Sequence, residues 1–237
     1  MLLSLPVTSH AVSVQPLVID LQTRGRATSQ IIRVENTYKT PLPVEIRIFE
    51  ADYTDEGLLP TSRPSGELLV FPPQALIAPG KTQAFRVQYV GDSVVDRSRH
   101  FVVTIAQLPV QLPQSGSKVQ ILYNFNIVVG VAAPSAKAAL RIERSEIEVG
   151  ADAKARPIFY VRNDAETYGY LANGSLSIKQ RDASGREIFS RDLTDQQVNQ
   201  EIGLGLVGPG QTRRLVVPIP LPQTGGTVDA RYNPNRR

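Results

Sequence analysis

Apolar and polar residues alternate in short runs along most of this chain. The runs 29–36 and 42–50 each place branched apolar residues on one face, and the run 82–90 alternates Phe85, Val87 and Tyr89. Alternation of this kind is the pattern of a β-strand with one buried face. The 18 prolines and 17 glycines lie between such runs rather than in one tract. The pattern predicts an all-β protein.

A short sequence signature occurs twice. Val34-Glu35-Asn36 is followed by Pro79-Gly80-Lys81-Thr82, and Val161-Arg162-Asn163 is followed at a similar distance by Pro209-Gly210-Gln211-Thr212. Two copies of one β-unit, in a chain of 237 residues, predict two domains. The expected boundaries are 12–134 for the first domain, 135–139 for a linker, 140–222 for the second domain and 223–237 for a disordered tail. Residues 52–66, which are polar and contain Gly and Pro, are expected to form a long surface loop.

Residues 1–11 form an apolar run that ends in Ser9-His10-Ala11, like the end of a signal peptide with a small-x-small cleavage site. The basic region that precedes such a run is missing. A signal remnant is preferred to a slightly apolar tail, and it predicts export. No other run reaches the ~18 apolar residues of a membrane-spanning helix, so stable membrane insertion is not expected.

Composition argues against catalysis. The chain has no Cys, and its only histidines are His10 and His100, of which His100 is read as a packed or solvated residue at the start of a strand. No nucleophile elbow is present, and the acidic residues of the 52–56 segment lack calcium-loop spacing. No catalytic residue, metal site or cofactor is expected. The net charge of +4 has no basic, aromatic-rich face with it, so nucleic acid is not an expected partner.

The longest apolar strand predicted from the sequence covers residues 118–131. Its even positions are mixed, whereas its odd positions form one continuous apolar face: Val119, Ile121, Tyr123, Phe125, Ile127 and Val129. A core strand explains part of this face. As the last strand of its domain it could also lie at a sheet edge, where an apolar strand that no Lys or Pro interrupts from Val119 to Val131 invites pairing with a partner or with itself. A slip of one residue would present Leu122, Asn124 and Val128 instead.

Residues 12–134 resemble the N-terminal domain of the periplasmic chaperones that assemble pili and fimbriae. The resemblance is carried by the order and spacing of several short motifs, and it extends weakly to the second copy. These motifs are Val70-Phe71-Pro72-Pro73, Ala78-Pro79-Gly80-Lys81-Thr82-Gln83, Phe85-Arg86-Val87, Asp96-Arg97-Ser98-Arg99, Leu108-Pro109 and Val131-Ala132-Ala133-Pro134.

The resemblance implies two immunoglobulin-like β-sandwich domains in tandem, set at an angle. It implies a chaperone of the periplasm that donates the odd face of its long strand to pilin-like subunits and delivers them to an outer-membrane usher. The donated side chains would be Val119, Ile121, Tyr123, Phe125, Ile127 and Val129. No cofactor is implied, because strand exchange is driven by better packing in the fibre.

One departure from the family pattern concerns the client's C-terminal carboxylate. Better-known members hold it with an Arg on the first strand and a Lys on the last, where this chain has Pro16 and Val129. The chain therefore resembles a divergent, archaic-type member. Asp96, Arg97, Arg99 and Arg24 are the charges to consider instead, with an Asp96–Arg97 salt bridge as the structural interpretation.

Two other functions remain open. A fibre subunit or adhesin with immunoglobulin-like domains should carry its own N-terminal donor extension, and residues 11–18 are short and interrupted by Pro16. A β-sandwich hydrolase is disfavoured by the lack of paired, spaced carboxylates.

Overall fold

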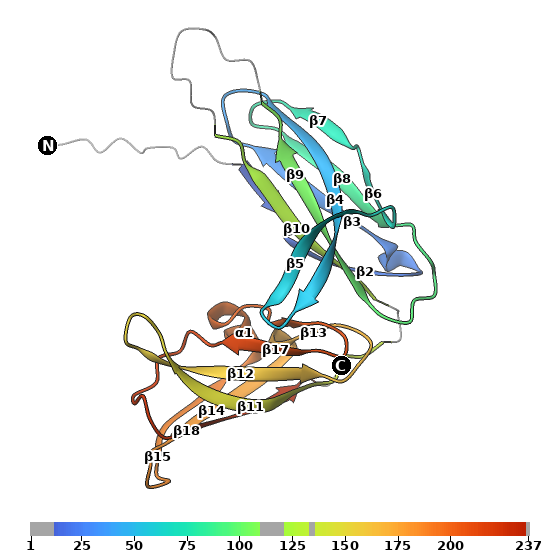
Figure 1. The fold of residues 1–237 in the computed structure, drawn as a ribbon. Coiled ribbons are helices and arrows are strands. Elements are labelled where there is room, and N and C mark those ends of the chain that lie inside the picture. The colour runs from blue at the N-terminus through green and yellow to red at the C-terminus, as the bar shows by residue number, and fades with distance from the viewer. Residues whose placement is uncertain (1–11, 110–120, 133–135, 236–237) are drawn as a thin grey trace, which may run out of the picture. The chain divides into compact units, whose positions relative to one another are not determined.

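The chain divides into two compact units in the computed structural model, which describes residues 12–109, 121–132 and 136–235 (Figure 1). Unit 1 comprises 1–51, 60–95 and 99–131, and unit 2 comprises 52–59, 96–98 and 132–237. Two short segments of the N-terminal half therefore belong to unit 2, which the sequence boundaries do not anticipate. The predicted signal remnant, 1–11, lies outside the described residues.

Unit 1 is a sandwich of two sheets, one in the strand order β1-β3-β8-β6 and one in the order β2-β10-β9-β4-β5, with β7 paired to β4. Its core is built from the inward faces that the alternation predicts: Ile32, Val34, Phe85 and Val87 are completely buried. The strands are β1 (Val12–Gln15), β2 (Val18–Gln22), β3 (Ser29–Asn36), β4 (Leu42–Thr54), β5 (Gly57–Pro64), β6 (Leu68–Phe71), β7 (Gln74–Ile77), β8 (Thr82–Tyr89), β9 (Arg99–Gln107) and β10 (Asn124–Ala132), with a short helix η1 (Arg26–Thr28) after β2.

The segment 52–66 corrects a prediction. Instead of a long loop, it contains the end of β4 and all of β5, which is the neighbour of β4 in the sheet. The hydroxyl of Thr61 donates to the carbonyl oxygen of Glu50 at 2.8 Å, and Arg63 forms an ion pair with the Glu50 carboxylate at 2.9 Å. Polar residues and prolines can occupy an edge strand, so composition alone concealed this one.

Unit 2 contains two three-stranded sheets, β11-β12-β17 and β15-β14-β18, and the pair β13-β16. Phe159, Val161, Leu171, Ile178 and Val198 are fully buried in its core. The elements are β11 (Leu140–Val149), β12 (Ala155–Asn163), β13 (Gly169–Tyr170), η2 (Leu171–Asn173), β14 (Gly174–Arg181), β15 (Glu187–Leu193), α1 (Asp195–Glu201), β16 (Leu206–Val207), β17 (Thr212–Val216) and β18 (Thr227–Pro234).

The predicted disordered tail, 223–237, was wrong for most of its length. Residues 227–234 form β18, which pairs antiparallel with the whole of β14, from Gly174 opposite Pro234 to Arg181 opposite Thr227. Val228 is buried, and Ala230 and Tyr232 pack on the core of unit 2. This weak alternation between polar residues does not stand out in the sequence, but pairing with β14 supplies the hydrogen bonds that the strand requires.

The asparagine of the first signature copy is a buried clamp. Asn36 is fully buried, and its Nδ2 donates to the carbonyl oxygens of Thr40 and Ile77, each at 2.9 Å. Its Oδ1 accepts from the backbone N–H of Tyr38 at 2.9 Å. One side chain thus ties the turn after β3 to the residue two positions before Pro79.

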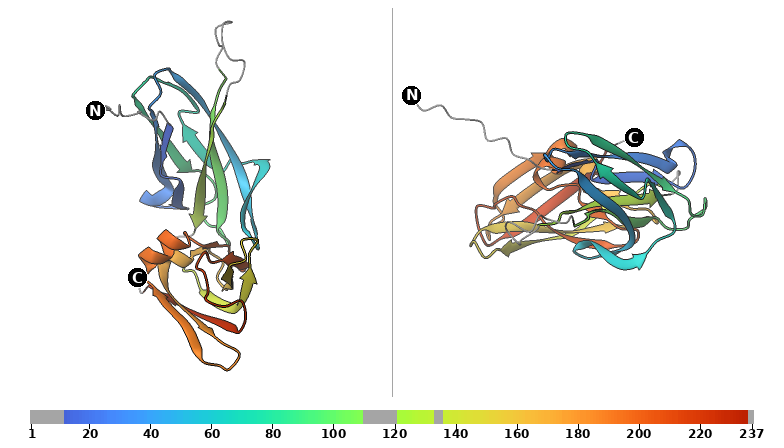
Figure 2. Two further views of the ribbon diagram at one scale, coloured as in Figure 1. Left: turned by 90° about the vertical axis from the view of Figure 1, so that its left-hand side faces the viewer. Right: turned by 90° about the horizontal axis from the view of Figure 1, so that it is seen from above.

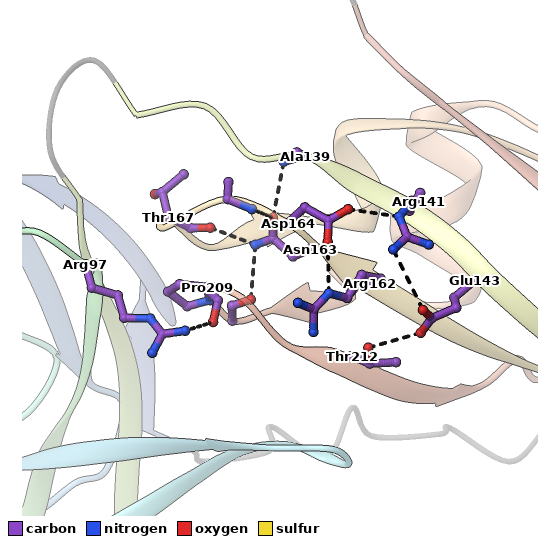
Figure 3. A network of polar contacts seen from close by, with 12 residues as sticks. Arg97, Ala139, Arg141, Glu143, Arg162, Asn163, Asp164, Thr167, Pro209 and Thr212 are labelled. Atoms are coloured by element: carbon purple, nitrogen blue, oxygen red, sulfur yellow. Dashed lines mark hydrogen bonds and ion pairs between the residues drawn. The ribbon is translucent and has the colours of Figure 1, made fainter.

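The asparagine of the second copy makes the same contacts in unit 2 (Figure 3). Asn163 Nδ2 donates to Thr167 O at 2.7 Å, to Val207 O at 3.3 Å and to Gly208 O at 3.1 Å. Its Oδ1 accepts from the N–H of Ala165 at 3.2 Å. The partners lie two and four residues after each asparagine and two before each Pro-Gly turn, so the repeat seen in the sequence is a repeat of hydrogen bonds.

A membrane-spanning helix is not found among the described residues. The longest α-helix described, α1, has 7 residues and begins with a capping box formed by Thr194 and Gln197.

Candidate functional site

The apolar stripe of the long strand passes from the core of unit 1 to solvent. Ile127 and Val129 have no exposed surface, and Phe125 is half-buried and packs against the core. Tyr123 is 45 % exposed and Ile121 is 67 % exposed, and both lie just before the first residue of β10. The sequence treats these residues as equivalent, whereas the structure divides them into an anchoring part and a presented part. Val119, the remaining residue of the predicted stripe, lies outside the described residues.

The anchoring part is held by β9. The two strands run antiparallel and side by side, from Asn124 opposite Ala106 to Val131 opposite Arg99 (Figures 1 and 2). The predicted strand was expected to begin at residue 118, but the described strand begins at Asn124. Strand β9 ends at Gln107, so a ladder of hydrogen bonds cannot continue past it in the regular way.

Within residues 12–109, 121–132 and 136–235, the other side of β10 is covered along its second half only. Strand β2 is its neighbour there, with the N–H of Val128 donating to Leu17 O at 3.0 Å. The hydroxyl of Thr23, just after β2, donates to Ser93 O at 2.8 Å, in the segment that leads into β9. Because β9 begins opposite the end of β10, β2 must run from Val128 toward that end.

The first half of β10 therefore has an edge that no described strand covers. Backbone groups of successive residues point to opposite sides of a strand, so those of Asn124 and Asn126 point to the same side as the N–H of Val128, away from β9. The sequence suggested that this strand could lie at the edge of its sheet. Among the described residues that holds for the first half of β10 only, because β2 lies beyond its second half. Unpaired backbone groups beside an apolar stripe are what an added strand requires.

Arg97 and Asp96 do not form the predicted salt bridge. Within unit 2, Arg97 Nε lies 3.2 Å from a carboxylate oxygen of Glu166, and its Nη2 donates to Pro209 O at 2.5 Å (Figure 3). Among the described residues no ion pair joins Arg97 to Asp96. Asp96 and Arg97 are adjacent in sequence, but the folded chain brings Arg97 to Glu166 and Pro209 instead.

Arg99, at the start of β9, forms an ion pair with Glu67. Both partners keep part of their surface in water, and a pair of that kind contributes little to stability. Arg24 is exposed, and Val129 is buried in the core of unit 1.

His100 is a packed residue, one of the two alternatives that the sequence allowed. It is 2 % exposed on β9, and burial lowers its pKa to about 3. An imidazole that remains neutral and inaccessible is unsuited to general acid–base catalysis at neutral pH. Among the described residues no group of His, Cys, Asp or Glu could hold a metal ion.

Two residues that the sequence analysis did not single out lie beside the stripe. The hydroxyl of Thr104 donates to Asn126 Oδ1 at 2.8 Å, directly across from β9 to β10. Gln107 contacts the backbone of Tyr123 twice. Nothing in their sequence context marks them, because each role depends on where β9 lies and ends.

The chain resembles solved structures of fimbrial chaperones over nearly its whole length. It is 12 % identical to the class 5 fimbriae chaperone CfaA, with a TM-score of 0.54 and 95 % of this chain and 93 % of that chain covered. A chain of the Salmonella enterica complex of the SafA pilin with the SafB chaperone is 16 % identical, with a TM-score of 0.53 and coverage of 97 % and 99 %. A chain of the archaic chaperone–tip subunit complex CsuC–CsuE of Acinetobacter baumannii is 12 % identical, with a TM-score of 0.50 and coverage of 87 % and 90 %.

These likenesses, at low identity, establish the fold: the all-β architecture of two immunoglobulin-like domains is the one predicted. Among curated proteins, no sequence matches this chain significantly. The family model described as "pili and flagellar-assembly chaperone, PapD N-terminal domain" matches residues 11–131, just over half of the 237 residues. The chain therefore belongs to the family of pilus-assembly chaperones.

Proposed function

We propose that this protein is a periplasmic chaperone that binds pilin-like subunits by donating residues 121–125 as a strand and passes them to an outer-membrane usher. The observation that carries the proposal is the combination of an apolar stripe, exposed at Ile121 and Tyr123, with an open backbone edge in the first half of β10. Membership in the pilus-assembly chaperone family supports it. The structures of chaperones in complex with a pilin or a tip subunit are consistent with it.

The stripe has the chemistry that donation needs. Full burial of an Ile or Tyr side chain stabilises a complex by about 1.5–3 kcal/mol, and each backbone hydrogen bond adds about 1 kcal/mol. Ile127 and Val129 hold the strand on the chaperone's own core, so the exposed end can enter a partner while the other end remains in place. A subunit that is packed less well on this strand than in its fibre can leave without an energy source.

The proposal is tested by expressing this chain in the periplasm with each small, secreted, β-rich protein encoded next to its gene, and purifying it by a C-terminal tag. A stoichiometric complex with a subunit that is degraded when expressed alone is expected. Absence of any such complex, with a chain that is stable and monomeric, would favour a structural fibre domain instead.

The strand assignment is tested in the same system by Ile121→Asp with Tyr123→Asp. Both side chains are exposed, so the fold should survive, and subunit affinity should fall at least about a hundredfold because charges enter an apolar groove. Val94→Asp is the matched control, because Val94 is 73 % exposed in the segment before β9. Wild-type affinity in the double variant would show that another surface binds the subunit.

Export and transfer are separate parts of the proposal. Fractionation of cells that produce the complete gene product should place it in the periplasm. The purified chaperone–subunit complex should bind the usher encoded with it, whereas the chaperone alone should bind it more weakly.

A further inference from the structure

The presented end of the stripe is fixed to β9 by one residue, Gln107, through its backbone and its side chain. The backbone N–H of Gln107 donates to Tyr123 O at 3.0 Å, and Gln107 Oε1 accepts from the N–H of Tyr123 at 3.3 Å. In a regular antiparallel ladder the second bond would be made by the carbonyl oxygen of the same residue. Here the side-chain amide makes it at the last residue of β9.

The bond adds one pair of hydrogen bonds beyond the end of the sheet. Asn124 opposite Ala106 is the first regular pair of the two strands, and Tyr123 lies outside β10. The Gln107 contact keeps the Tyr123 backbone in the register of the strand that follows. The Tyr123 ring stacks on Phe125, with ring centroids 6.5 Å apart, so both side chains continue the same face.

This register decides which side chains a client would meet. With Tyr123 held opposite Gln107, the odd residues Ile121, Tyr123 and Phe125 share one face. A local slip of one residue before Asn124, which the ladder holds opposite Ala106, would turn Leu122 to that face instead. Leu122 is 42 % exposed and would be the competing apolar contact.

We propose that Gln107 is a positioning residue: its side-chain oxygen holds the Tyr123 backbone so that the odd face of residues 121–125 is presented to the client. The inference rests on the proposed function, because it names what sets the register of the donated strand. Gln107 contacts the strand backbone and so acts on every client alike, independent of the client's sequence.

The chain offers closely matched variants for a test. Gln107→Leu keeps the shape and the backbone N–H of residue 107 but removes the acceptor, whereas Gln107→Glu keeps an acceptor oxygen in the same place. Thr104→Val removes the hydrogen bond to Asn126, which lies where the β9–β10 backbone ladder already holds the strand. It should therefore leave Tyr123 unaffected.

The first measurement is amide hydrogen exchange at Tyr123 in the free protein. Exchange is expected to speed up by about fivefold to tenfold in Gln107→Leu, the loss of one modest hydrogen bond, and to stay at the wild-type rate in Gln107→Glu and Thr104→Val. An unchanged rate in Gln107→Leu would overturn the inference.

The second measurement uses the co-expressed secreted subunit as the probe. In the wild type, Ile121→Asp should weaken binding far more than Leu122→Asp, and in the Gln107→Leu background this difference should shrink by about fivefold to tenfold. The same discrimination in both backgrounds would overturn the role in register even if exchange at Tyr123 changes. If the wild type captures no subunit, the proposed function fails, while the exchange measurement still decides whether Gln107 holds the segment.

Discussion

The two units share their turns and differ in their strand edges. Asn36 and Asn163 make corresponding hydrogen bonds to the carbonyl oxygens four residues on and to those two residues before a Pro-Gly turn. Few other side chains could replace either asparagine, because the buried carbonyl oxygens would then lack a hydrogen-bond donor, which is costly. The same hydrogen-bonded turn, centred on an asparagine, is therefore present in both units.

The edges have taken opposite forms. In unit 2, β11 is the outermost strand of its sheet, and it carries ion pairs between Arg141 and Asp164 and between Arg144 and Glu146. A register shift interrupts it between Ile142 and Arg144, and the Arg144 guanidinium lies 3.3 Å from the centre of the Tyr160 ring. Charges and bulges of this kind prevent the pairing of edges. The first half of β10 has neither, so an edge strand of unit 2 is protected, whereas this edge of unit 1 carries no such protection and meets no strand of the described part of the chain.

The largest effect is expected from breaking the shared frame. Asn36→Asp and Asn163→Asp keep the shape of the side chain but replace the donor with an oxygen that faces two or three carbonyl oxygens. Each should destabilise its own unit by about 3 kcal/mol or more. Urea unfolding followed by hydrogen exchange of peptides from each unit would measure both.

Asn233→Asp provides the control, because Asn233 is exposed on β18, and the change should have little effect. A large loss for one clamp and none for the other would mean that the two copies share a sequence signature without sharing its energetic role.

A smaller effect is expected from acid, which should lower the free energy of unfolding of unit 1 before that of unit 2. His100 is buried in unit 1 with its pKa lowered to about 3, while the unfolded chain takes up a proton near pH 6.5. As the pH falls below about 6.5, the unfolded state gains a proton that the folded state refuses. Unit 1 should therefore lose up to about 1.4 kcal/mol per pH unit until the folded pKa is approached.

Unit 2 contains no histidine, and its sensitivity to acid begins lower. The pKa of Asp164 is lowered by its hydrogen bonds with Arg141 and Arg162, so the stability it contributes is lost only as the pH falls below about 4. Unfolding of each unit at pH 7, 5.5 and 4.5 should show unit 1 weakening first, and His100→Gln should flatten its slope. An equal slope in the wild type and the variant would assign the effect to other groups.

The sequence predicted the buried strands of the sandwich better than the edge strands and the candidate site. Alternation identifies the buried faces of Ile32, Val34, Phe85 and Val87, because burial on one side of a sheet requires it. Edge strands obey no such requirement, which is why β5 was taken for a loop and β18 for a disordered tail.

The apolar stripe was also visible in the sequence, but its division into a buried part and an exposed part was not. Ile127 and Ile121 occupy equivalent positions in the alternation, but Ile127 lies within β10 and is buried in the core of unit 1, whereas Ile121 precedes β10 and is exposed. Gln107 has no signal at all, since its contact with Tyr123 exists only because β9 ends there.

The smallest change in stability is expected from removing the protection of β11. Arg144→Val with Glu146→Val should alter the free energy of unfolding by less than about 1 kcal/mol, because both side chains are about half exposed and such pairs contribute little. Self-association should nevertheless increase, since valines favour strand pairing on an edge without charges. Analytical ultracentrifugation over a range of protein concentrations would measure this, with Lys179→Val and Glu187→Val, an ion pair between β14 and β15, as the control. If the β11 variant stays as monomeric as the wild type, the Arg144–Glu146 pair is not what protects this edge, and the protection would rest on the Arg141–Asp164 pair and the register shift of β11.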